Sequence, residues 1–276
     1  MTPPIRIRSL LPSPSEVRVR VRPVVAISLA LIAASGCSKP APTFDEILPA
    51  EELWAEGQQI LAGGRFLWVI PRVDYDRAIE VFQTIIDNYP YSDYAVMAEI
   101  QIADAYFEQK KYEEALSYYR DFSDLHPQNE RVPYAIFRAA LCHQRRVKAP
   151  NRDQTATREA LTYLDRLISN HPHSEYTPEA EDLWREMRLR LARQIMGIAD
   201  FYRKRDEFES ATARYRSLLN EYPGLGLDAV ALFQLGVCYR EMDRGEEAKR
   251  IFQAIVQNYY DSEVARDAER MIARGP

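Results

Sequence analysis

Glycine is scarce in this chain, and runs that alternate β-branched with polar residues are nearly absent. Its 276 residues include 10 glycines, with 46% hydrophobic and 28% charged side chains. Such a composition can bury a large core and lies outside the range of disordered proteins. Without alternating runs the sequence predicts helices rather than strands.

Motifs of catalysis are also missing. The sequence has no glycine-rich phosphate loop, no nucleophile elbow and no histidine paired with an acid at a catalytic spacing. His171 and His173 are a possible metal pair, but no cysteine or acid stands at ligand spacing from them. We therefore predict a non-enzymatic protein with no metal and no cofactor. The alternative is an enzyme whose chemistry is hidden in loops.

No apolar run is long enough to cross a bilayer. The longest at the N-terminus, residues 24–34, is far shorter than the roughly 20 residues that a spanning helix needs. Five arginines and a single acid precede it, and Ser35, Gly36 and Cys37 follow. This order predicts a secretory signal peptide over residues 1–36. A disordered basic tail before a short buried helix is the alternative.

The end of this segment, Ala34-Ser35-Gly36-Cys37, resembles a lipobox. That resemblance implies cleavage before Cys37 and acylation of the cysteine, and Ser38 after it favours sorting to the outer membrane. Each buried CH₂ of an acyl chain contributes about 0.8 kcal/mol, so several chains anchor a protein stably. Residues 37–49 then form a proline-rich tether, and we expect a periplasmic lipoprotein on the cell outer membrane.

The net charge argues against one class of partner, and the positions of the remaining cysteines argue against a disulfide. Loss of five arginines and one glutamate with the signal peptide changes the net charge from −5 to −9. An acidic protein of this kind is a poor nucleic-acid binder. Cys142 and Cys238 lie in separate repeats, so we predict two buried thiols rather than a redox pair.

Five alanines frame an internal repeat. The framing alanines are spaced by 37, 45, 51 and 37 residues, and a proline follows each of the first four after twelve residues. They are Ala78, Ala115, Ala160, Ala211 and Ala248, and the prolines are Pro90, Pro127, Pro172 and Pro223. A fixed unit that tolerates insertions is typical of stacked helical repeats.

The pattern within each unit is that of tetratricopeptide repeats. Small residues at positions 8 and 20 allow two antiparallel helices to approach closely, and aromatic residues at positions 11 and 24 fill the space beside them. The sequence therefore predicts an all-α tetratricopeptide-repeat solenoid of five helix pairs plus a C-terminal capping helix over 261–274. Repeat four carries a long first helix that starts with Thr177 as N-cap and Pro178 at N1 and ends near Lys204.

Repeat one contains an apolar insert. Phe66, Leu67, Trp68, Val69 and Ile70 follow one another, which is too apolar for a free loop. A lid folded over repeat one is one interpretation. A contact for a membrane or a client protein is the other, in which case Trp68→Ser weakens that association and leaves folding intact.

The lipobox, the five repeats, the stretch NYPYSDYAVMAEIQIADAYF and the loop RDQTATREA together resemble the BamD family of lipoproteins. The resemblance covers about residues 48–257. It implies a scaffold of the outer-membrane β-barrel assembly machine that binds the periplasmic domains of the barrel-forming subunit (BamA-like) and the C-terminal signals of client outer-membrane proteins. Accessory lipoproteins are further expected partners.

Two halves with different roles are expected. Residues 50–175, repeats one to three, form the client-binding half, and residues 176–276 form the partner-subunit half. The first helices of the repeats line the concave face and supply an aromatic groove for a client peptide, in which an arginine pairs with the terminal carboxylate. The predicted groove residues are Trp54, Ile100, Asp104, Phe107, Tyr134, Phe137 and Arg145.

Arg214 is the candidate contact with the partner subunit, because the resemblance implies an arginine at this position that faces the assembly subunit. A solvated surface arginine is the alternative. A different periplasmic repeat adaptor, such as the tetratricopeptide protein of the Tol–Pal system, is the second functional hypothesis. That family has fewer repeats, an N-terminal coiled coil and no acyl anchor.

Overall fold

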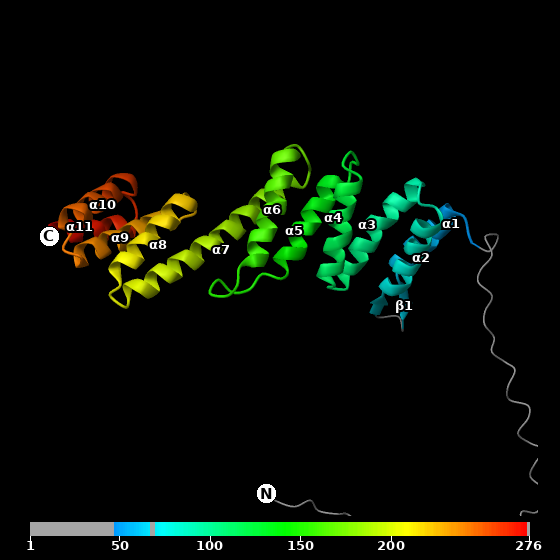
Figure 1. Ribbon diagram of the computed structural model, residues 1–276, viewed down its shortest axis with the longest axis horizontal. Coiled ribbons are helices and arrows are strands. Elements are labelled where there is room, and N and C mark those ends of the chain that lie inside the picture. Colours follow the sequence, from blue (N-terminus) through cyan, green and yellow to red (C-terminus); the bar gives the residue numbers. More distant parts are fainter. Residues whose placement is uncertain (1–46, 67–69, 275–276) are drawn as a thin grey trace, which may run out of the picture. The chain divides into compact units, whose positions relative to one another are not determined.

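The computed structural model describes residues 47–66 and 70–274, and within them the unit from Leu48 onward contains eleven helices and one small β-hairpin (Figure 1). The helices are α1 (Ala50–Leu61), α2 (Tyr75–Asn88), α3 (Asp93–Glu108), α4 (Tyr112–Leu125), α5 (Val132–Gln144), α6 (Thr155–Asn170), α7 (Thr177–Arg203), α8 (Phe208–Glu221), α9 (Asp228–Glu241), α10 (Gly245–Asn258) and α11 (Glu263–Ala273). The predicted signal peptide and Cys37 lie outside the described residues.

Each helix packs against the helices that precede and follow it in the chain, as Figure 1 shows. The pairs are α1/α2, α3/α4, α5/α6, α7/α8 and α9/α10, and α11 packs against both α9 and α10. Five helix pairs and a terminal helix were predicted, and the tetratricopeptide-repeat fold is confirmed.

The small residues stand where the helices of a pair cross. All five framing alanines are buried, with exposed fractions of 0 to 2%. Opposite them, Gly57 and Gly236 leave room for an aromatic ring: a Cβ at Gly57 would lie 2.5 Å from the Phe82 ring, and one at Gly236 would lie 2.7 Å from the Phe252 ring. Real side chains cannot approach that closely, so the crossing depends on residues with little or no side chain.

The turns inside the pairs also repeat. Lys110, Asp206 and Asp243 occupy the same position in repeats two, four and five, and each has a φ between 60° and 63°. The next residue donates its backbone N–H to the carbonyl five residues back, from Lys111 to Tyr106 and likewise in the other two repeats. This bond satisfies a carbonyl that the helix end leaves free.

The second helix of a repeat ends two residues before the framing proline, as predicted. The helices α2, α4, α6 and α8 end at Asn88, Leu125, Asn170 and Glu221. However, α10 ends in the same way at Asn258, where Tyr260 replaces the proline. The residue after each of these helices has a similar backbone conformation, such as φ −131° and ψ 50° at Tyr222 and φ −129° and ψ 37° at Tyr259. Proline therefore favours the ending but is not required for it.

The apolar insert contains a β-hairpin that the sequence did not predict: Gly64–Phe66 (β1) and Ile70–Arg72 (β2) pair as antiparallel strands in which Phe66 is opposite Ile70. One local prediction needs correction. The long helix α7 spans Thr177–Arg203 as expected, but its N-cap is Tyr176 rather than Thr177. The Thr177 hydroxyl instead donates to the backbone carbonyl of His171, at 2.7 Å, which ties the start of α7 to the end of α6.

The long loop between α5 and α6 is built around one buried side chain. The amide of Gln154, 1% exposed, donates to the carbonyls of Ala149 at 2.8 Å and Arg152 at 3.2 Å, and its oxygen accepts from the Thr157 hydroxyl. From α7, Arg190 donates to the carbonyl of Lys148 at 2.8 Å. The insertion of repeat three is thus an ordered segment attached to α7.

Buried apolar side chains form two clusters that both include part of α7. From α7, the first cluster contains the buried residues Ala180, Leu183 and Met187. The second cluster contains the buried Ala199 of α7, and the partly buried Ile195 packs against it. The predicted division at residue 175 assigned all of α7 to the second half, whereas the core changes from one cluster to the other in the middle of this helix.

Candidate functional site

A polar cluster lies where α3, α4 and α5 meet, and Asp104 is its centre. The Tyr119 hydroxyl donates to Asp104 Oδ1 at 2.5 Å, and the Tyr134 hydroxyl donates to the same oxygen at 2.6 Å. The guanidinium of Arg138 lies 3.5 Å from it. Three helices from two consecutive repeats are therefore joined through one carboxylate.

Arg138 completes the cluster from α5. Its Nε donates to the Tyr119 hydroxyl at 3.0 Å, and its guanidinium carbon lies 3.8 Å from the centre of the Phe107 ring. A cation over an aromatic face is attracted by the ring quadrupole, most strongly when water is excluded. With its side chain 17% exposed, Arg138 is held between Phe107 and the two polar groups.

Burial dominates the electrostatics of this cluster. It raises the pKa of Asp104 above the usual value of a carboxyl, against the opposing effect of the hydrogen bonds from Tyr119 and Tyr134 and the charge of Arg138. Burial and the neighbouring carboxylate also raise the pKa of Tyr119 and of Tyr134. Both phenols therefore keep their protons at neutral pH and act as donors.

An open hollow of about 540 Å³ borders the cluster. It is lined by Asp104, Glu130, Arg131, Tyr134, Glu175 and Tyr176. The rings of Tyr134 and Tyr176 lie 5.5 Å apart, and Phe137 stacks on Tyr176 at 6.0 Å. The hollow combines an aromatic wall with three carboxylates and one guanidinium, so it suits an aromatic or polar group better than a free carboxylate.

The predicted groove residues separate into three groups. Asp104, Phe107, Tyr134 and Phe137 meet at the cluster and its hollow. Ile100 is wholly buried in the core, and a client cannot reach it. Trp54 packs on Phe82 and Tyr94 in the first two repeats, away from the cluster.

Arg145 is exposed and stands directly after α5, eleven residues from Tyr134. Eleven residues of helix span about 16 Å and return to nearly the same face. Arg145 therefore lies about three helical turns along α5 from Tyr134 rather than beside the aromatic wall.

Three important residues of the site escaped sequence reasoning: Tyr119, Arg138 and Tyr176. Arg138 is four residues after Tyr134, a spacing that places both on one helix face and could have identified it. Tyr119 is the aromatic residue at position 24 of its repeat, where the sequence predicts only a side chain that fills the core. That its hydroxyl donates a hydrogen bond to Asp104 is known only from the structure. Tyr176 lies just before α7, where no repeat position predicts its direction.

The second half presents an exposed surface on α7 and α8. Arg214 is exposed on α8, and no acidic group of the described residues lies within ion-pair distance of it. On α7, Ile198 is 37% and Phe201 54% exposed, and the guanidinium of Arg205 lies 5.2 Å from the centre of the Phe201 ring. A Cβ at Gly197 would meet no atom within 4 Å, so the helix backbone is accessible there.

Several predicted sites receive no test from the geometry. Cys37, Leu67 and Trp68 lie outside the described residues, and nothing is described of the side chains of Phe66 and Ile70. Cys142 and Cys238 are free and buried, as predicted, and burial raises the pKa of Cys142 to about 12 and that of Cys238 to about 11. Over residues 47–66 and 70–274, no group of three metal-ligating side chains occurs, and no helix combines the length and apolarity needed to cross a membrane.

Comparison with known families agrees with this architecture. The profile of YfiO, described as "Outer membrane lipoprotein", matches residues 50–249, which include α1 to α9 and the start of α10. The chain belongs to the YfiO family of outer membrane lipoproteins. The resemblance inferred from the lipobox and the repeats is thereby confirmed.

This YfiO-family protein is 28% identical over 257 residues to the outer membrane protein assembly factor BamD of Caulobacter vibrioides, and the match covers 91% of this chain and 81% of the relative. The BamD proteins of Rickettsia prowazekii and Vibrio cholerae are 25% and 24% identical and cover 86% and 82% of this chain and 91% and 95% of their own lengths. These relatives are assembly factors, in agreement with the prediction of a non-enzymatic protein.

Among solved structures, the TPR2AB domain of yeast Sti1 in a pHSP90 complex is 14% identical and has a TM-score of 0.44, covering 78% of this chain and 80% of that one. The TPR domain of P58(IPK) is 12% identical with a TM-score of 0.41, covering 80% of this chain and 54% of that one.

Proposed function

We propose that this YfiO-family lipoprotein is a scaffold of outer-membrane β-barrel assembly that binds client proteins with repeats one to three and a barrel-forming partner subunit with repeats four and five. The observation that carries the proposal is the family match over residues 50–249, combined with a stack of helix pairs that carries two chemically different surfaces. Repeat stacks of this kind generally bind polypeptides.

The client surface is the hollow beside Asp104 together with Arg145. An aromatic side chain of an extended client packs on Tyr134, Tyr176 and Phe137, and the free C-terminal carboxylate pairs with Arg145. Since the hollow is lined by Asp104, Glu130 and Glu175, it repels that carboxylate. The rise of about 16 Å along α5 from Tyr134 to Arg145 corresponds to about five residues of an extended strand.

A peptide titration tests this surface. The probe is a synthetic C-terminal strand of an outer-membrane protein, made with a free carboxylate and, separately, as the carboxamide. We expect Arg145→Ala to lower the affinity for the free-acid peptide to that for the carboxamide peptide. The affinity for the carboxamide peptide should stay unchanged. Arg152→Ala, an exposed arginine of the neighbouring loop, is the matched control. Equal losses for both peptides, or no loss, would remove Arg145 from the site.

The partner surface is the exposed face of α7 and α8. Phe201 and Ile198 supply an apolar centre on α7, the Arg205 guanidinium lies 5.2 Å from the centre of the Phe201 ring, and α8 adds the exposed Arg214. Interface cores are typically apolar and aromatic, whereas marginal charges mainly steer association. Arg214 therefore acts on the association rate and the choice of partner, and Phe201 on the residence time.

Copurification from detergent-solubilised outer membrane tests the partner half. We expect the wild type and the control Arg266→Asp, an exposed arginine of α11, to recover a barrel-forming subunit with periplasmic repeats. Arg214→Asp and Phe201→Ser should lose most of it. Recovery of Tol components in its place would contradict the proposal and favour the alternative adaptor.

Cys37 is proposed as the lipid anchor. Labelling cells with a radioactive fatty acid should mark the wild type and leave Cys37→Ala unlabelled. A labelled Cys37→Ala protein would place the acyl chain elsewhere.

A further inference from the structure

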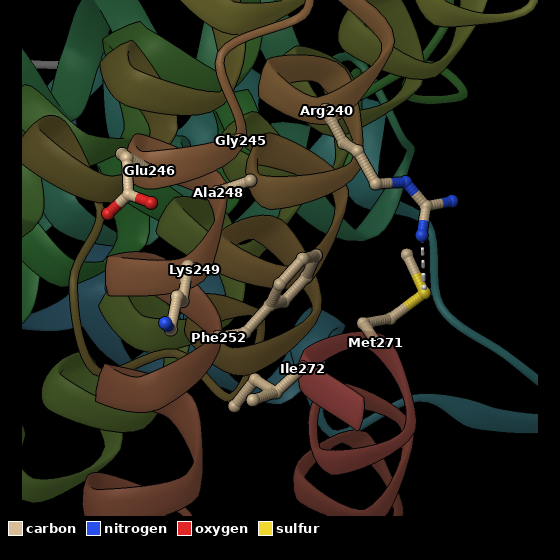
Figure 2. A pocket seen from close by; sticks show the side chains of 8 residues that line it. All are labelled: Arg240, Gly245, Glu246, Ala248, Lys249, Phe252, Met271 and Ile272. Atoms are coloured by element: carbon tan, nitrogen blue, oxygen red, sulfur yellow. Dashed lines mark hydrogen bonds between the residues drawn. The ribbon is translucent and has the colours of Figure 1, made fainter. Parts of the chain in front are cut away.

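A small pocket lies among the last three helices, away from both surfaces described above. It is lined by Arg240 of α9, Gly245, Glu246, Ala248, Lys249 and Phe252 of α10, and Met271 and Ile272 of α11. Figure 2 shows Arg240 and Met271 on one side of the Phe252 ring, and Glu246 and Lys249 on the other. An apolar floor is thus flanked by polar groups.

The floor of the pocket is fixed from behind. Phe252 is 2% exposed, and its ring lies against the backbone of Gly236, where a Cβ would come within 2.7 Å. Ala248, also 2% exposed, adjoins it. A ring held this tightly cannot swing into the pocket, so the cavity is a permanent feature of the crossing between α9 and α10.

The size of the pocket selects an aliphatic group. Its volume is about 80 Å³. A cavity of about 150 Å³ accommodates benzene. The present pocket therefore suits a branched group of about three or four carbon atoms, such as the end of a valine or leucine side chain, better than an aromatic ring.

Arg240 makes weak contacts within the chain. Its Nη1 donates to the sulfur of Met271 at 3.3 Å, and its Nη2 lies 3.9 Å from a carboxylate oxygen of Glu241. A thioether is a weak acceptor, whereas a guanidinium offers five donors in a fork that matches a carboxylate. Arg240 thus holds strong donors at the pocket wall without a strong acceptor.

Lys249 adds a second positive charge. No acidic group of the described residues lies within ion-pair distance of its ammonium, and the side chain is exposed. Lys249 offsets Glu246, and Glu241 lies 3.9 Å from Nη2 of Arg240, so an anion is favoured by the hydrogen-bond donors of Arg240 that lack a strong acceptor and not by the net charge of the pocket.

We propose that this pocket binds the free C-terminus of a partner protein that ends in an aliphatic residue, with the terminal side chain on Phe252 and Ile272 and the α-carboxylate on Arg240. A terminal residue carries its carboxylate on the same Cα as its side chain, so one residue fills the cavity and meets the guanidinium. An internal aspartate or glutamate provides its charge on a different side chain from the aliphatic group. The small volume distinguishes this ligand from a chain that ends in an aromatic residue.

Methyl NMR tests the proposal on the full-length protein in detergent micelles, labelled with ¹³C at the methionine methyl groups. The probe is N-acetyl-L-leucine. We expect its titration to shift the Met271 methyl signal and to leave that of the buried Met187 in α7 unchanged. N-acetyl-L-leucinamide, which lacks the charge, should bind at least tenfold more weakly, and N-acetyl-L-phenylalanine should not shift Met271.

Variants identify the groups responsible. Arg240→Gln should reduce the affinity for N-acetyl-L-leucine at least tenfold, whereas the exposed control Arg266→Gln should not change it, with an unchanged unfolding midpoint showing that both proteins fold. No shift of Met271, equal binding of acid and amide, or full binding by Arg240→Gln would overturn the proposal. Equal binding of the internal acid N-acetyl-aspartyl-leucinamide would overturn the choice of a free C-terminus.

Discussion

The Tyr119 hydroxyl donates to Asp104 Oδ1 at 2.5 Å, and Tyr215 donates to Asp200 at the same distance two repeats later. In both cases the tyrosine occupies position 24 and the aspartate position 9 of its repeat. The two sites differ in their surroundings, because Arg138 from the next repeat covers the first one, and the aspartate side chain is 25% exposed there and 36% exposed in the second.

We expect Tyr119→Phe to lower the free energy of unfolding by about 1–3 kcal/mol, because it removes a donor from a partly buried carboxylate and an acceptor from Arg138. Tyr215→Phe should cost less, since water reaches Asp200 more easily. Urea denaturation followed by circular dichroism measures both. A larger loss of unfolding free energy for Tyr215→Phe than for Tyr119→Phe would show that the Asp104 cluster does not stabilise its repeats more than the Asp200 site does.

Alanine substitutions at Gly236 and Gly197 compare a glycine at a helix crossing with a glycine on an exposed helix surface. Gly236→Ala places a Cβ against Phe252 and should cost about 1–3 kcal/mol through overpacking. Gly197→Ala meets no atom in the exposed interior of α7 and should stabilise the protein by up to about 1 kcal/mol. Thermal unfolding of the two variants should shift in opposite directions. Shifts of the same sign would contradict the dependence of the crossing on a missing side chain.

Gln154 should hold the loop between α5 and α6. Gln154→Ala leaves two backbone carbonyls and the Thr157 hydroxyl without this partner, and we expect a loss of about 1–3 kcal/mol. Limited proteolysis should then cut the loop faster. Asn151→Ala, an exposed position in the same loop, is the control and should behave as the wild type. Similar cutting of both variants would assign the order of the loop to other contacts.

His143 should make stability depend on pH. It occupies an aromatic position of repeat three, stacks on Tyr163 at 5.4 Å and is 6% exposed. Burial lowers its pKa, with Arg146 acting in the same direction and Glu159 against it. The folded protein therefore binds fewer protons than the unfolded chain, and the contribution of His143 is complete above about pH 6.5 and is lost as the pH falls below that value.

Urea midpoints across this pH range measure the effect. His143→Phe should flatten the fall in stability below about pH 6.5, whereas the exposed control His173→Asn should leave it unchanged. An unaltered slope in His143→Phe would assign the dependence to other groups.

Sequence alone was sufficient for the features that follow from spacing. The framing alanines, the five pairs, the terminal helix and the extent of α7 all depend on local periodicity and on prolines, and the structure has them as predicted. The hairpin of β1 and β2 was missed, because a short apolar run has no period that separates a strand from a loop.

The candidate site was only partly predictable. Helix positions identified Asp104 and Tyr134, but they placed Ile100 on the surface, because a repeat register does not tell which side chains the neighbouring repeat covers. Arg138 and Tyr119 acquire their roles from contacts between repeats, which depend on how adjacent pairs stack. Pair formation is a local property, whereas the chemistry of the surface arises from the stacking.

Site-specific photocrosslinking in cells tests most directly whether the α7–α8 face binds a barrel-forming subunit. A photoreactive phenylalanine analogue placed at Phe201 should crosslink to that subunit, and the same analogue at Tyr91, fully exposed in the first half, should not. A crosslink from position 91 alone, or none from position 201, would contradict the account.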